Sequence, residues 1–463
     1  MLRIYTGNGK QDVKDSRRDF LQIGSLMLGS LTLPQLLHAR AENVNFVKDK
    51  SVVLLYLSGG ASQIETFDPK MAAPAEIRSV NGEVSTSLSG VTFGATLQKL
   101  ARRARQMSVI RSHNHSVGAH EQAHVHVLTG GTDPSGGGKT GFGMGALYAR
   151  LRGANHPETG IPTNCLLTAP EIDGQYRKEL ARVRKGSRPL ELGASYAPFE
   201  PGGNSSALNN MKLTLQAQRF DDRRSLLTSL DSWKRRVDGL RQVQGVDRFN
   251  QQAVDLLTGG AVDAIDLTRE DPAVLAKYDT SEMRIGFKQF RPSMLGHKML
   301  MARRLCEAGA GFVTVHSAGW DMHADGNNPG MQQGMAMLGT TMDHAVSAFL
   351  DDVAARGLSE KILLVITGDF GRTPRVNKKG GRDHWAKLGT LAFAGGGLNM
   401  GQVIGQSDRQ AAQPMTSPYT TSHLMGTIMQ TLFDVGKMRL VSGIPPQIRR
   451  LVEESVSIPE LMP

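Results

Sequence analysis

Acidic, basic and imidazole side chains gather directly after an apolar run near residue 366. The run Ile362 to Ile366 is typical of a buried strand, and the stretch Thr367 to Trp385 that follows is rich in ionisable residues: Asp369, Asp383, Arg372, Arg375, Arg382 and His384. A carboxylate beside a buried strand is costly unless it is paired or bound to metal, and arginine suits two-point recognition of phosphate or sulfate. The stretch indicates a site for a metal, an oxyanion or both. A buried salt-bridge network is the structural alternative.

A second group of possible ligands is formed by Asp321, His323 and Asp325, at alternate positions of the loop 317–329. Side chains at alternate positions of an extended segment converge on one face. Carboxylate oxygen together with imidazole nitrogen suits zinc, manganese or iron. The alternative is a turn in which the aspartates cap backbone amides and His323 is merely exposed.

Histidines are concentrated between residues 113 and 126. If the part after Gly118 is helical, His120 and His124 lie on one face at i and i+4, which is a usable ligand geometry. Glu121 lies next to His120 and could orient a ring nitrogen. Histidines on a polar surface are the alternative interpretation.

A glycine-containing loop follows the apolar run 51–58, which is typical of a strand buried on both faces. In this loop Ser62 could donate its hydroxyl to a ligand, and a plain strand-to-helix turn is the alternative. A further sequence, Gly138-Lys139-Thr140, does not complete a nucleotide-binding phosphate loop, because Asp133 stands where the first glycine is required.

The elements that must position these residues alternate between strands and helices. We expect strands at 51–58, 107–111, 311–316, 361–367 and 389–394, and helices at 97–106, 294–308, 331–356 and 423–433. This alternation predicts an α/β fold with a mostly parallel sheet and helices on both faces. Ligands bind at the carboxyl ends of the strands in such folds. The region 177–292 breaks the alternation and is interpreted as a mostly helical insertion, with helices at 220–243 and 249–257.

The N-terminus has the features of an export signal. A twin-arginine motif, Arg17-Arg18, precedes the apolar stretch 23–37, and Ala39 and Ala41 have the small-residue spacing that a signal peptidase accepts. The apolar stretch is too short for a comfortable membrane span. We expect residues 1–41 to be a Tat signal peptide and the mature protein, without a transmembrane segment, to be periplasmic or secreted. A helix docked on the domain is the alternative.

The formal net charge is +11, of which +8 remains after residue 41. The basic residues are scattered, without the aromatic spacing of a nucleic-acid binder, so no nucleic-acid partner is expected. A diffuse positive field favours anionic substrates such as phosphate esters, sulfate esters or acidic glycans. The two cysteines, Cys165 and Cys306, are too few for a thiolate metal site. Buried free thiols are favoured over a disulfide.

The motifs together resemble the domain-of-unknown-function 1501 family of exported bacterial proteins, within the alkaline phosphatase-like superfamily. The resemblance rests on Leu57 to Ser62, Thr66 to Lys70, Val109 to Ser112, the histidine run to Gly130, Gly319 to His323, Gly368 to Pro374, and Gly381 to Trp385. It implies a three-layer α/β sandwich like that of phosphatases and sulfatases, with one or two divalent cations at the strand ends.

The sequence departs from the superfamily pattern at three places. Phe370 stands where the pattern has a metal-binding histidine, and Gly59-Gly60-Ala61 where the first strand has a metal-binding aspartate. His120 occupies the position of the sulfatase nucleophile. The resemblance therefore implies that the usual hydroxyl or thiol nucleophile is absent and that one of two metal subsites is dismantled.

From these observations we expect a metal-dependent hydrolase of phosphate or sulfate esters, with zinc, manganese or calcium as cofactor. The expected metal ligands are Asp321, His323, Asp383 and His384. Arg372, Arg382 and Ser62 are expected to bind the substrate, and His120 and Asp369 to be catalytic, with His120 as acid, base, phosphoryl acceptor or further ligand. The alternative is a non-catalytic protein on the same fold that binds anions or glycans, because the usual nucleophile is missing.

Overall fold

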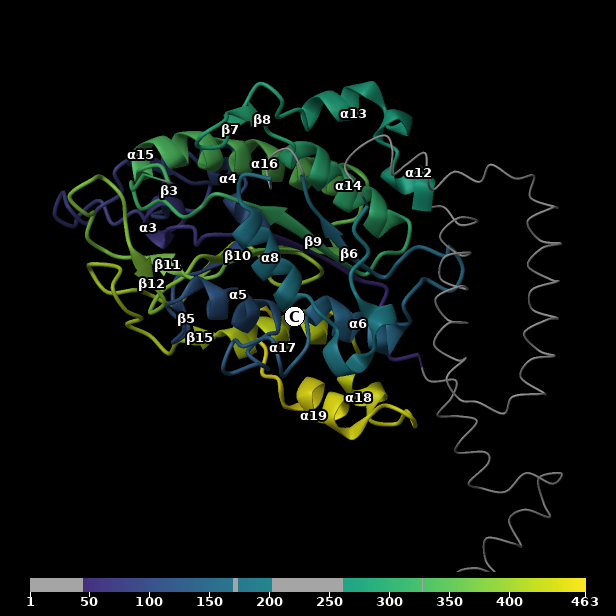
Figure 1. Cartoon of the computed structure of the whole chain (residues 1–463). Coiled ribbons are helices and arrows are strands. Elements are labelled where there is room, and N and C mark those ends of the chain that lie inside the picture. Colours follow the sequence, from purple (N-terminus) through teal and green to yellow (C-terminus); the bar gives the residue numbers. More distant parts are fainter. Residues whose placement is uncertain (1–44, 170–173, 202–260, 327) are drawn as a thin grey trace, which may run out of the picture.

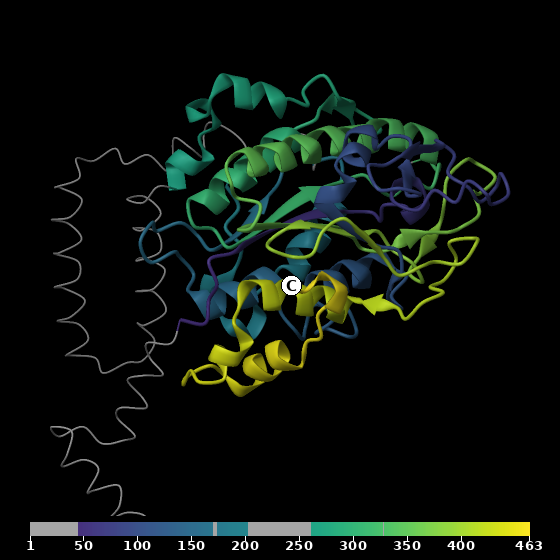
Figure 2. The ribbon, with the colours of Figure 1, turned by 180° about the vertical axis from the view of Figure 1, so that it is seen from behind.

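The computed structural model describes residues 45–169, 174–201, 261–326 and 328–463. The expected Tat signal and the helices expected at 220–243 and 249–257 lie outside these residues. Figures 1 and 2 show one α/β body in which a central sheet has helices above and below it. No helix of the described part is long and apolar enough to cross a membrane.

The main sheet has the strand order β14-β4-β13-β10-β1-β9-β6. Its members are β1 (Ser51–Leu57), β4 (Met107–Ile110), β6 (Asn164–Leu167), β9 (Phe312–Ser317), β10 (Ile362–Gly368), β13 (Leu391–Gly395) and β14 (Gln402–Ile404). Strand β13 runs antiparallel to both of its neighbours, β10 and β4, whereas the other neighbouring strands pair in parallel. The prediction of a mostly parallel α/β sheet is confirmed. Strands β6 and β14, which are too short for a clear apolar run, were not expected.

Alternate residues of β1 supply two separate cores, one on each face of the sheet. Val53, Leu55 and Leu57 belong to the core beneath α4 (Gln98–Arg102), α14 (Leu295–Glu307) and α16 (Thr340–Ala355). Val52, Leu54 and Tyr56 belong to the other core, with α6 (Met144–Arg152), α17 (Thr421–Leu432) and α19 (Pro446–Glu454). The period of two in side-chain direction is that of a strand buried on both faces. The predicted three-layer arrangement therefore follows from strands that are apolar at every position.

The expected helix 331–356 is interrupted. It consists of α15 (Met331–Gly334), a π-helical turn at Met335–Gly339 and α16. The remaining helices near the sheet are α3 (Gln63–Thr66), α5 (His120–Leu128) and α18 (Val435–Met438). Small two-stranded sheets are formed by β2 (Glu83–Ser85) with β3 (Thr92–Gly94), β5 (His113–Asn114) with β15 (Tyr419–Thr420), and β11 (Gly371–Arg372) with β12 (His384–Trp385).

The described parts of the predicted insertion contain short elements. They are α8 (Arg177–Gly186), α12 (Ala261–Ile265), α13 (Pro272–Lys277) and the hairpin of β7 (Arg284–Ile285) with β8 (Arg291–Pro292). Helix α8 packs beside α5, whereas α12 and α13 lie over α14 and α16 (Figure 1). The two ends of the insertion thus reach different parts of the body.

Both cysteines are buried free thiols. Burial raises the pKa of Cys165 and raises the pKa of Cys306 to about 12. Both therefore remain protonated and unreactive at neutral pH.

Candidate metal centre and cavity

Three neighbouring parallel strands end at one level of the sheet and deliver the candidate site. Leu57 at the end of β1 pairs with Gly368 of β10 on one side and with Ser317 of β9 on the other. The loops that follow carry Gly59, Asp369 and Asp321. Gly59 has a φ of +104°, and a side chain there would come within 2.5 Å of the Asp321 backbone nitrogen. Glycine at this position lets two strand-end loops touch.

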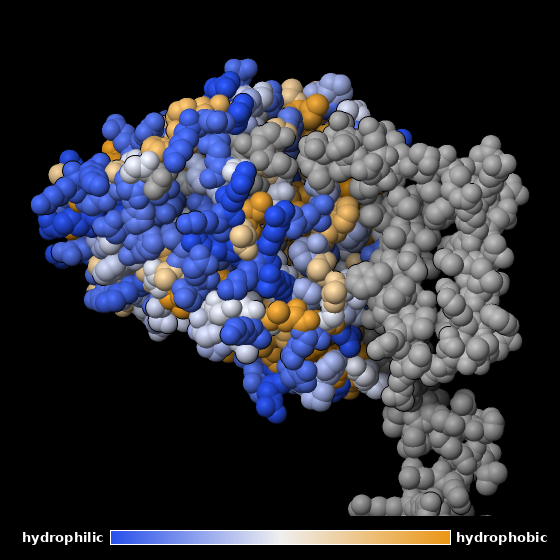
Figure 3. All heavy atoms as spheres, viewed as in Figure 1, coloured by the Kyte–Doolittle hydropathy of each residue, from blue (hydrophilic) through white to orange (hydrophobic). Residues whose placement is uncertain are grey.

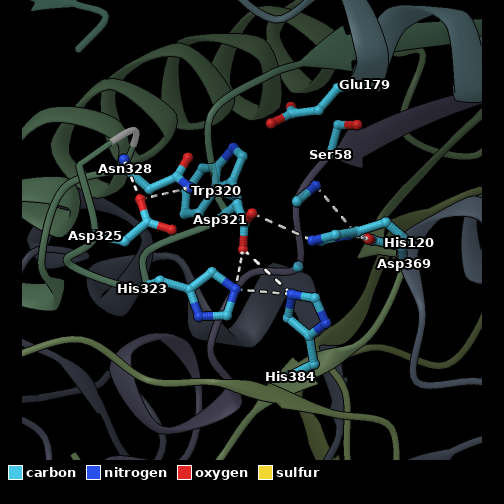
Figure 4. Close-up of polar contacts among 12 residues, drawn as sticks. Ser58, His120, Glu179, Trp320, Asp321, His323, Asp325, Asn328, Asp369 and His384 are labelled. Atoms are coloured by element: carbon cyan, nitrogen blue, oxygen red, sulfur yellow. Dashed lines mark hydrogen bonds and ion pairs between the residues drawn. The ribbon is translucent and has the colours of Figure 1, made fainter. Parts of the chain in front are cut away.

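Asp321 lies at the centre of a cluster with three imidazoles, His120, His323 and His384, whose ligand atoms all lie within 4.8 Å of one another. Asp321 Oδ2 is 3.3 Å from His120 Nε2, and Asp321 Oδ1 is 2.9 Å from His323 Nε2 and 3.5 Å from His384 Nε2. Figure 4 shows the three rings approaching this carboxylate from different elements. His120 begins α5, His323 follows β9, and His384 lies in β12. We call these four residues the open cluster.

Each imidazole of the open cluster is held by an oxygen acceptor on its other nitrogen. The Nδ1 atom lies 2.5 Å from Asp369 Oδ2 in His120, 3.0 Å from Asp383 Oδ1 in His323, and 3.2 Å from the Gly118 carbonyl in His384. Ionised carboxylates and carbonyls only accept, so Nδ1 carries the proton in all three rings. The Nε2 lone pairs are thereby directed toward Asp321, the arrangement in which histidine binds metals.

Two of these Nε2 atoms are closer together than two lone pairs tolerate. His323 Nε2 and His384 Nε2 are 2.8 Å apart, and His120 Nε2 is buried, with Asp321 Oδ2 as its partner at 3.3 Å. Two imidazoles on a tetrahedral zinc ion, with Zn–N bonds of about 2.0–2.1 Å, would have their nitrogens about 3.3 Å apart. The distance of 2.8 Å is that of a hydrogen bond, so one of the two Nε2 atoms carries a proton in the metal-free protein, and a metal would replace that proton. The donor set fits a divalent metal.

Charge in the open cluster is balanced in the metal-free protein by protonated imidazole. Burial lowers the pKa of His120, but Asp321 and Asp369 outweigh this effect and raise it to about 9. Asp321 also raises the pKa of His323 against burial. Burial raises the pKa of Asp321, but its hydrogen bonds to the three imidazoles outweigh this and hold it well below its ordinary value. A metal would compete with protons here.

A second group of possible ligands, His120, His124 and Asp369, lies deeper, and we call it the buried cluster. His124 and Asp369 are each fully buried. His124 Nδ1 is 2.9 Å from the His120 carbonyl, and its Nε2 is 2.7 Å from Ser58 Oγ. The carbonyl fixes the proton on Nδ1, so Nε2 accepts from the Ser58 hydroxyl. Asp369 Oδ1 accepts from the Gly59 N–H at 3.0 Å.

Phe370 supports the open cluster. Its buried ring lies 4.8 Å from the ring of His120 and 4.6 Å from that of His384, between ring centroids. It stands where the superfamily pattern has a histidine, and it packs against two candidate ligands instead of adding a third.

The two arginines expected to bind substrate are fully buried and donate to protein acceptors. Arg372 Nη2 donates to Asp321 Oδ1 at 2.6 Å, and Arg372 Nε donates to the Gly60 carbonyl at 2.9 Å. Arg382 forms an ion pair with Glu65 at 2.8 Å and donates to backbone carbonyls. The structure does not support their expected contact with a substrate anion. We assign them to positioning the loops, and in the case of Arg372 also Asp321.

The structure also changes two further expectations, those for Ser62 and Asp383, and decides between the alternatives for Asp325. Ser62 is buried and caps α3, accepting from the Glu65 N–H at 3.3 Å, so its expected role in substrate binding is not supported. The side chain of Asp383 is 60% exposed and contacts His323 from outside the cluster. It is placed as a support for that ligand. Asp325 accepts from the Asn328 N–H, as in the turn alternative.

A cavity of about 1040 Å³ opens beside the open cluster and is lined by His120 and Asp321. Its other wall comes from the two ends of the predicted insertion and contributes basic side chains: Arg177, Lys178 and Arg182 from α8, and Lys288 and Arg291 from the β7–β8 hairpin. Arg182 is paired with Glu121. Figure 3 shows a largely hydrophilic surface over this side of the molecule. Arg372 and Arg382 were expected to provide the positive charge that binds an anion. In the structure, other basic residues provide the positive charge of the cavity.

The family model described as "Protein of unknown function (DUF1501)" matches residues 49–462. The chain belongs to this family. None of the curated proteins compared with this DUF1501 chain matches it.

Solved structures that resemble the DUF1501 chain include phosphatases and sulfatases. The phosphonate monoester hydrolase of Silicibacter pomeroyi is 11% identical with a TM-score of 0.39, and the match covers 89% of this chain and 76% of that one. A TAB5 alkaline phosphatase mutant with bound magnesium is 12% identical with a TM-score of 0.38, covering 84% and 99%. The lipoteichoic acid synthase LtaP of Listeria monocytogenes is 10% identical with a TM-score of 0.37, covering 89% and 77%. These scores are low and carry no conclusion about activity.

Sequence reasoning missed three residues near the centre. Ser58 was treated only as the end of a strand, His124 only as a possible partner of His120, and Glu179 as part of an insertion. Glu179 is buried in the cavity wall. Only the i, i+4 spacing of His120 and His124 gave a signal in the sequence.

Proposed function

We propose that this DUF1501 protein is a metal-dependent hydrolase of phosphate or sulfate esters. The observation that carries the proposal is the common orientation of three imidazoles, whose Nδ1 atoms are held by oxygen acceptors and whose Nε2 atoms face Asp321. His120, Asp321, His323 and His384 would hold the metal, which is zinc, manganese or calcium. When bound, a divalent cation lowers the pKa of a water molecule and polarises the ester.

The residues of the chain itself supply binding and orientation. Arg177, Lys178 and Lys288 have no acidic partner within ion-pair distance among the described residues, and they line the cavity that contains Asp321. They would attract the anionic group and hold it beside the open cluster. Asp369 and Asp383 would keep His120 and His323 in the tautomer that presents Nε2. The proposed substrate is therefore an anionic small molecule or glycan ester.

The proposal is tested by metal content and turnover measured on one preparation. The protein is purified after native export, its metal is quantified, and phosphate and sulfate esters are assayed with added zinc, manganese or calcium. We expect about one tightly held divalent ion per chain and turnover with at least one ion. Only trace metal together with no turnover would overturn the proposal. Bound metal and bound anion without turnover would favour the non-catalytic alternative.

The cationic wall is tested with a charge-matched pair of variants. The double variant Arg177→Gln/Lys178→Gln should raise KM about tenfold or more with a small change in kcat, because it removes ground-state attraction for the anion. Lys378→Gln/Lys379→Gln removes the same charge from an exposed loop outside the cavity lining. Equal effects of the two pairs would show a general charge effect and remove the wall from the proposal.

We propose further that the protein acts after export by the Tat route, from the Arg17-Arg18 motif and the apolar stretch that follows it. Arg17→Lys/Arg18→Lys should leave the protein in the cytoplasmic fraction with its signal uncleaved. Export of this variant at the normal level would contradict the Tat route without bearing on the hydrolase proposal.

A further inference from the structure

Glu179 is a buried acid that the proposed metal centre does not use. It lies in the first turn of α8 and is 7% exposed. Its Oε2 accepts from the Gly319 N–H at 2.9 Å. Among the described residues no cation lies within ion-pair distance of its carboxyl, since Arg182 on the same helix pairs with Glu121. An ionised carboxylate so placed would be costly, and a protonated one would not.

The position of Glu179 relates it to the open cluster. Glu179, His120 and Asp321 line the same cavity. In Figure 4 the Glu179 carboxyl lies on the side of Asp321 away from His323 and His384, beside Ser58. The hydrogen bond to Gly319 anchors it to the same loop that carries Asp321. A substrate held at the open cluster would therefore meet this carboxyl on its cavity side.

The charges around Glu179 favour its protonated form. Burial raises the pKa of Glu179 to about 8, and the carboxylates of Asp321 and Asp369 act in the same direction. The Gly319 N–H and His120 oppose them. Of the other titratable groups nearby, burial raises the pKa of Tyr56 and of Tyr176, so both phenols are neutral. Of the cations of α8, Arg177 and Lys178 are exposed and line the cavity.

We propose that Glu179 donates the proton to the leaving group when the ester is cleaved, an inference that rests on the proposed hydrolase function. As the bond from phosphorus or sulfur to the leaving oxygen breaks, its electron pair stays on that oxygen, which takes the carboxyl proton of Glu179. A water oxygen forms the new bond to phosphorus or sulfur. One proton of that water returns to Glu179, so an ester and water give an alcohol and the free anion.

The test compares leaving groups of different basicity. A 4-nitrophenyl ester needs little proton transfer, whereas a phenyl or alkyl ester needs it. Glu179→Gln keeps an oxygen that can accept from the Gly319 N–H but has no acidic proton. It should lower kcat on the alkyl ester about 100-fold or more and leave kcat on the 4-nitrophenyl ester nearly unchanged. Tyr176→Phe, on the same wall, is the control. It should either lower kcat on both esters by the same factor or leave both kcat values unchanged.

The outcomes separate the two proposals. If Glu179→Gln lowers kcat on both esters by the same factor, Glu179 has a structural role. That result would overturn the proton-donor proposal and leave the hydrolase proposal standing. Wild-type protein that turns over no ester would overturn the hydrolase and the donor together. Infrared difference spectra of the metal-free protein add a readout without turnover. A protonated carboxyl band should be present at pH 7 in the wild type, absent in Glu179→Gln, and lost as the pH passes about 8. A carboxylate already ionised at pH 6 would overturn the inference.

Discussion

The open and buried clusters share His120 and contain the same residue types, yet they differ in what their atoms are free to do. In the open cluster the Nε2 atoms of His120, His323 and His384 face one carboxylate. In the buried cluster His124 uses Nδ1 on the His120 carbonyl and Nε2 on Ser58. Asp369 uses one oxygen on Gly59 and the other on His120. Residue type and proximity alone therefore do not define a metal site.

The difference assigns the clusters complementary roles. The open cluster borders the cavity, and its three Nε2 atoms face Asp321 and one another, with a single further donor, Arg372 Nη1, 3.4 Å from His323 Nε2, so it fits a metal. The buried cluster is a closed hydrogen-bond network whose members satisfy one another, which makes it a rigid support. His120 joins the two, with Nδ1 in the network and Nε2 in the open cluster.

The largest effect is expected from Asp321→Asn. It removes the carboxylate toward which three imidazoles point, so metal affinity should fall by more than about 100-fold, beyond the usual effect of losing a supporting residue. Affinity is measured by competition with a chromophoric chelator. Asp325→Asn is the control on the same loop and should change affinity little, because Asp325 accepts from Asn328 and does not belong to the open cluster. A Kd for Asp321→Asn near that of the wild type would remove the open cluster as the metal site.

A pH titration of metal affinity tests the protonation of the open cluster. The pKa of His120 is raised to about 9, so the metal-free protein carries this proton at pH 7 and must release it on binding. The Kd should therefore decrease about tenfold per pH unit from pH 7 to 9, and more steeply if His323 also releases a proton. Above pH 9 the dependence should level off. A Kd independent of pH in this range would mean that His120 does not bind the metal.

Substitution of the two supporting carboxylates should give graded losses. Asp369→Asn and Asp383→Asn each present an amide N–H to an imidazole Nδ1, which favours the tautomer with the proton on Nε2. Loss of such a support costs about 10–100-fold in metal affinity. The loss for Asp369→Asn should be near the upper value, because Asp369 is fully buried. The loss for Asp383→Asn should be near the lower value, because the Asp383 side chain is 60% exposed and water can replace it. The reverse order would show that Asp383 is itself a ligand.

The sequence predicted the central strands well because burial on both faces leaves a signal in every residue. The runs 51–58 and 361–367 appear as β1 and β10 with nearly the same limits. The parallel pairing of β1 with both β10 and β9 brings Asp369 and Asp321 to one edge, as expected for parallel strands. The antiparallel direction of β13 could not be predicted, because an apolar run has no information on its direction.

The roles of individual site residues were harder to predict because they depend on contacts between distant segments. Arg382 was expected to bind the substrate, and only its pairing with Glu65 shows that its donors are used within the protein. Glu179 lies far along the chain from Asp321, and its relation to Gly319 becomes visible only when α8 is placed. Charge on the chain was predictable, but its distribution between the cavity and the interior was not.

The smallest effect on metal binding is expected from Ser58→Ala, which breaks the buried cluster without touching the open one. Its hydroxyl donates to His124 Nε2 at 2.7 Å, so the variant leaves a buried acceptor unsatisfied, at about 1–3 kcal/mol of folding stability. Metal affinity should change less than about threefold, well below the effect of losing a supporting residue. Denaturant unfolding and metal titration measure the two quantities. If the variant instead keeps its stability and its metal but loses all turnover, Ser58 acts as a nucleophile and the buried cluster is catalytic.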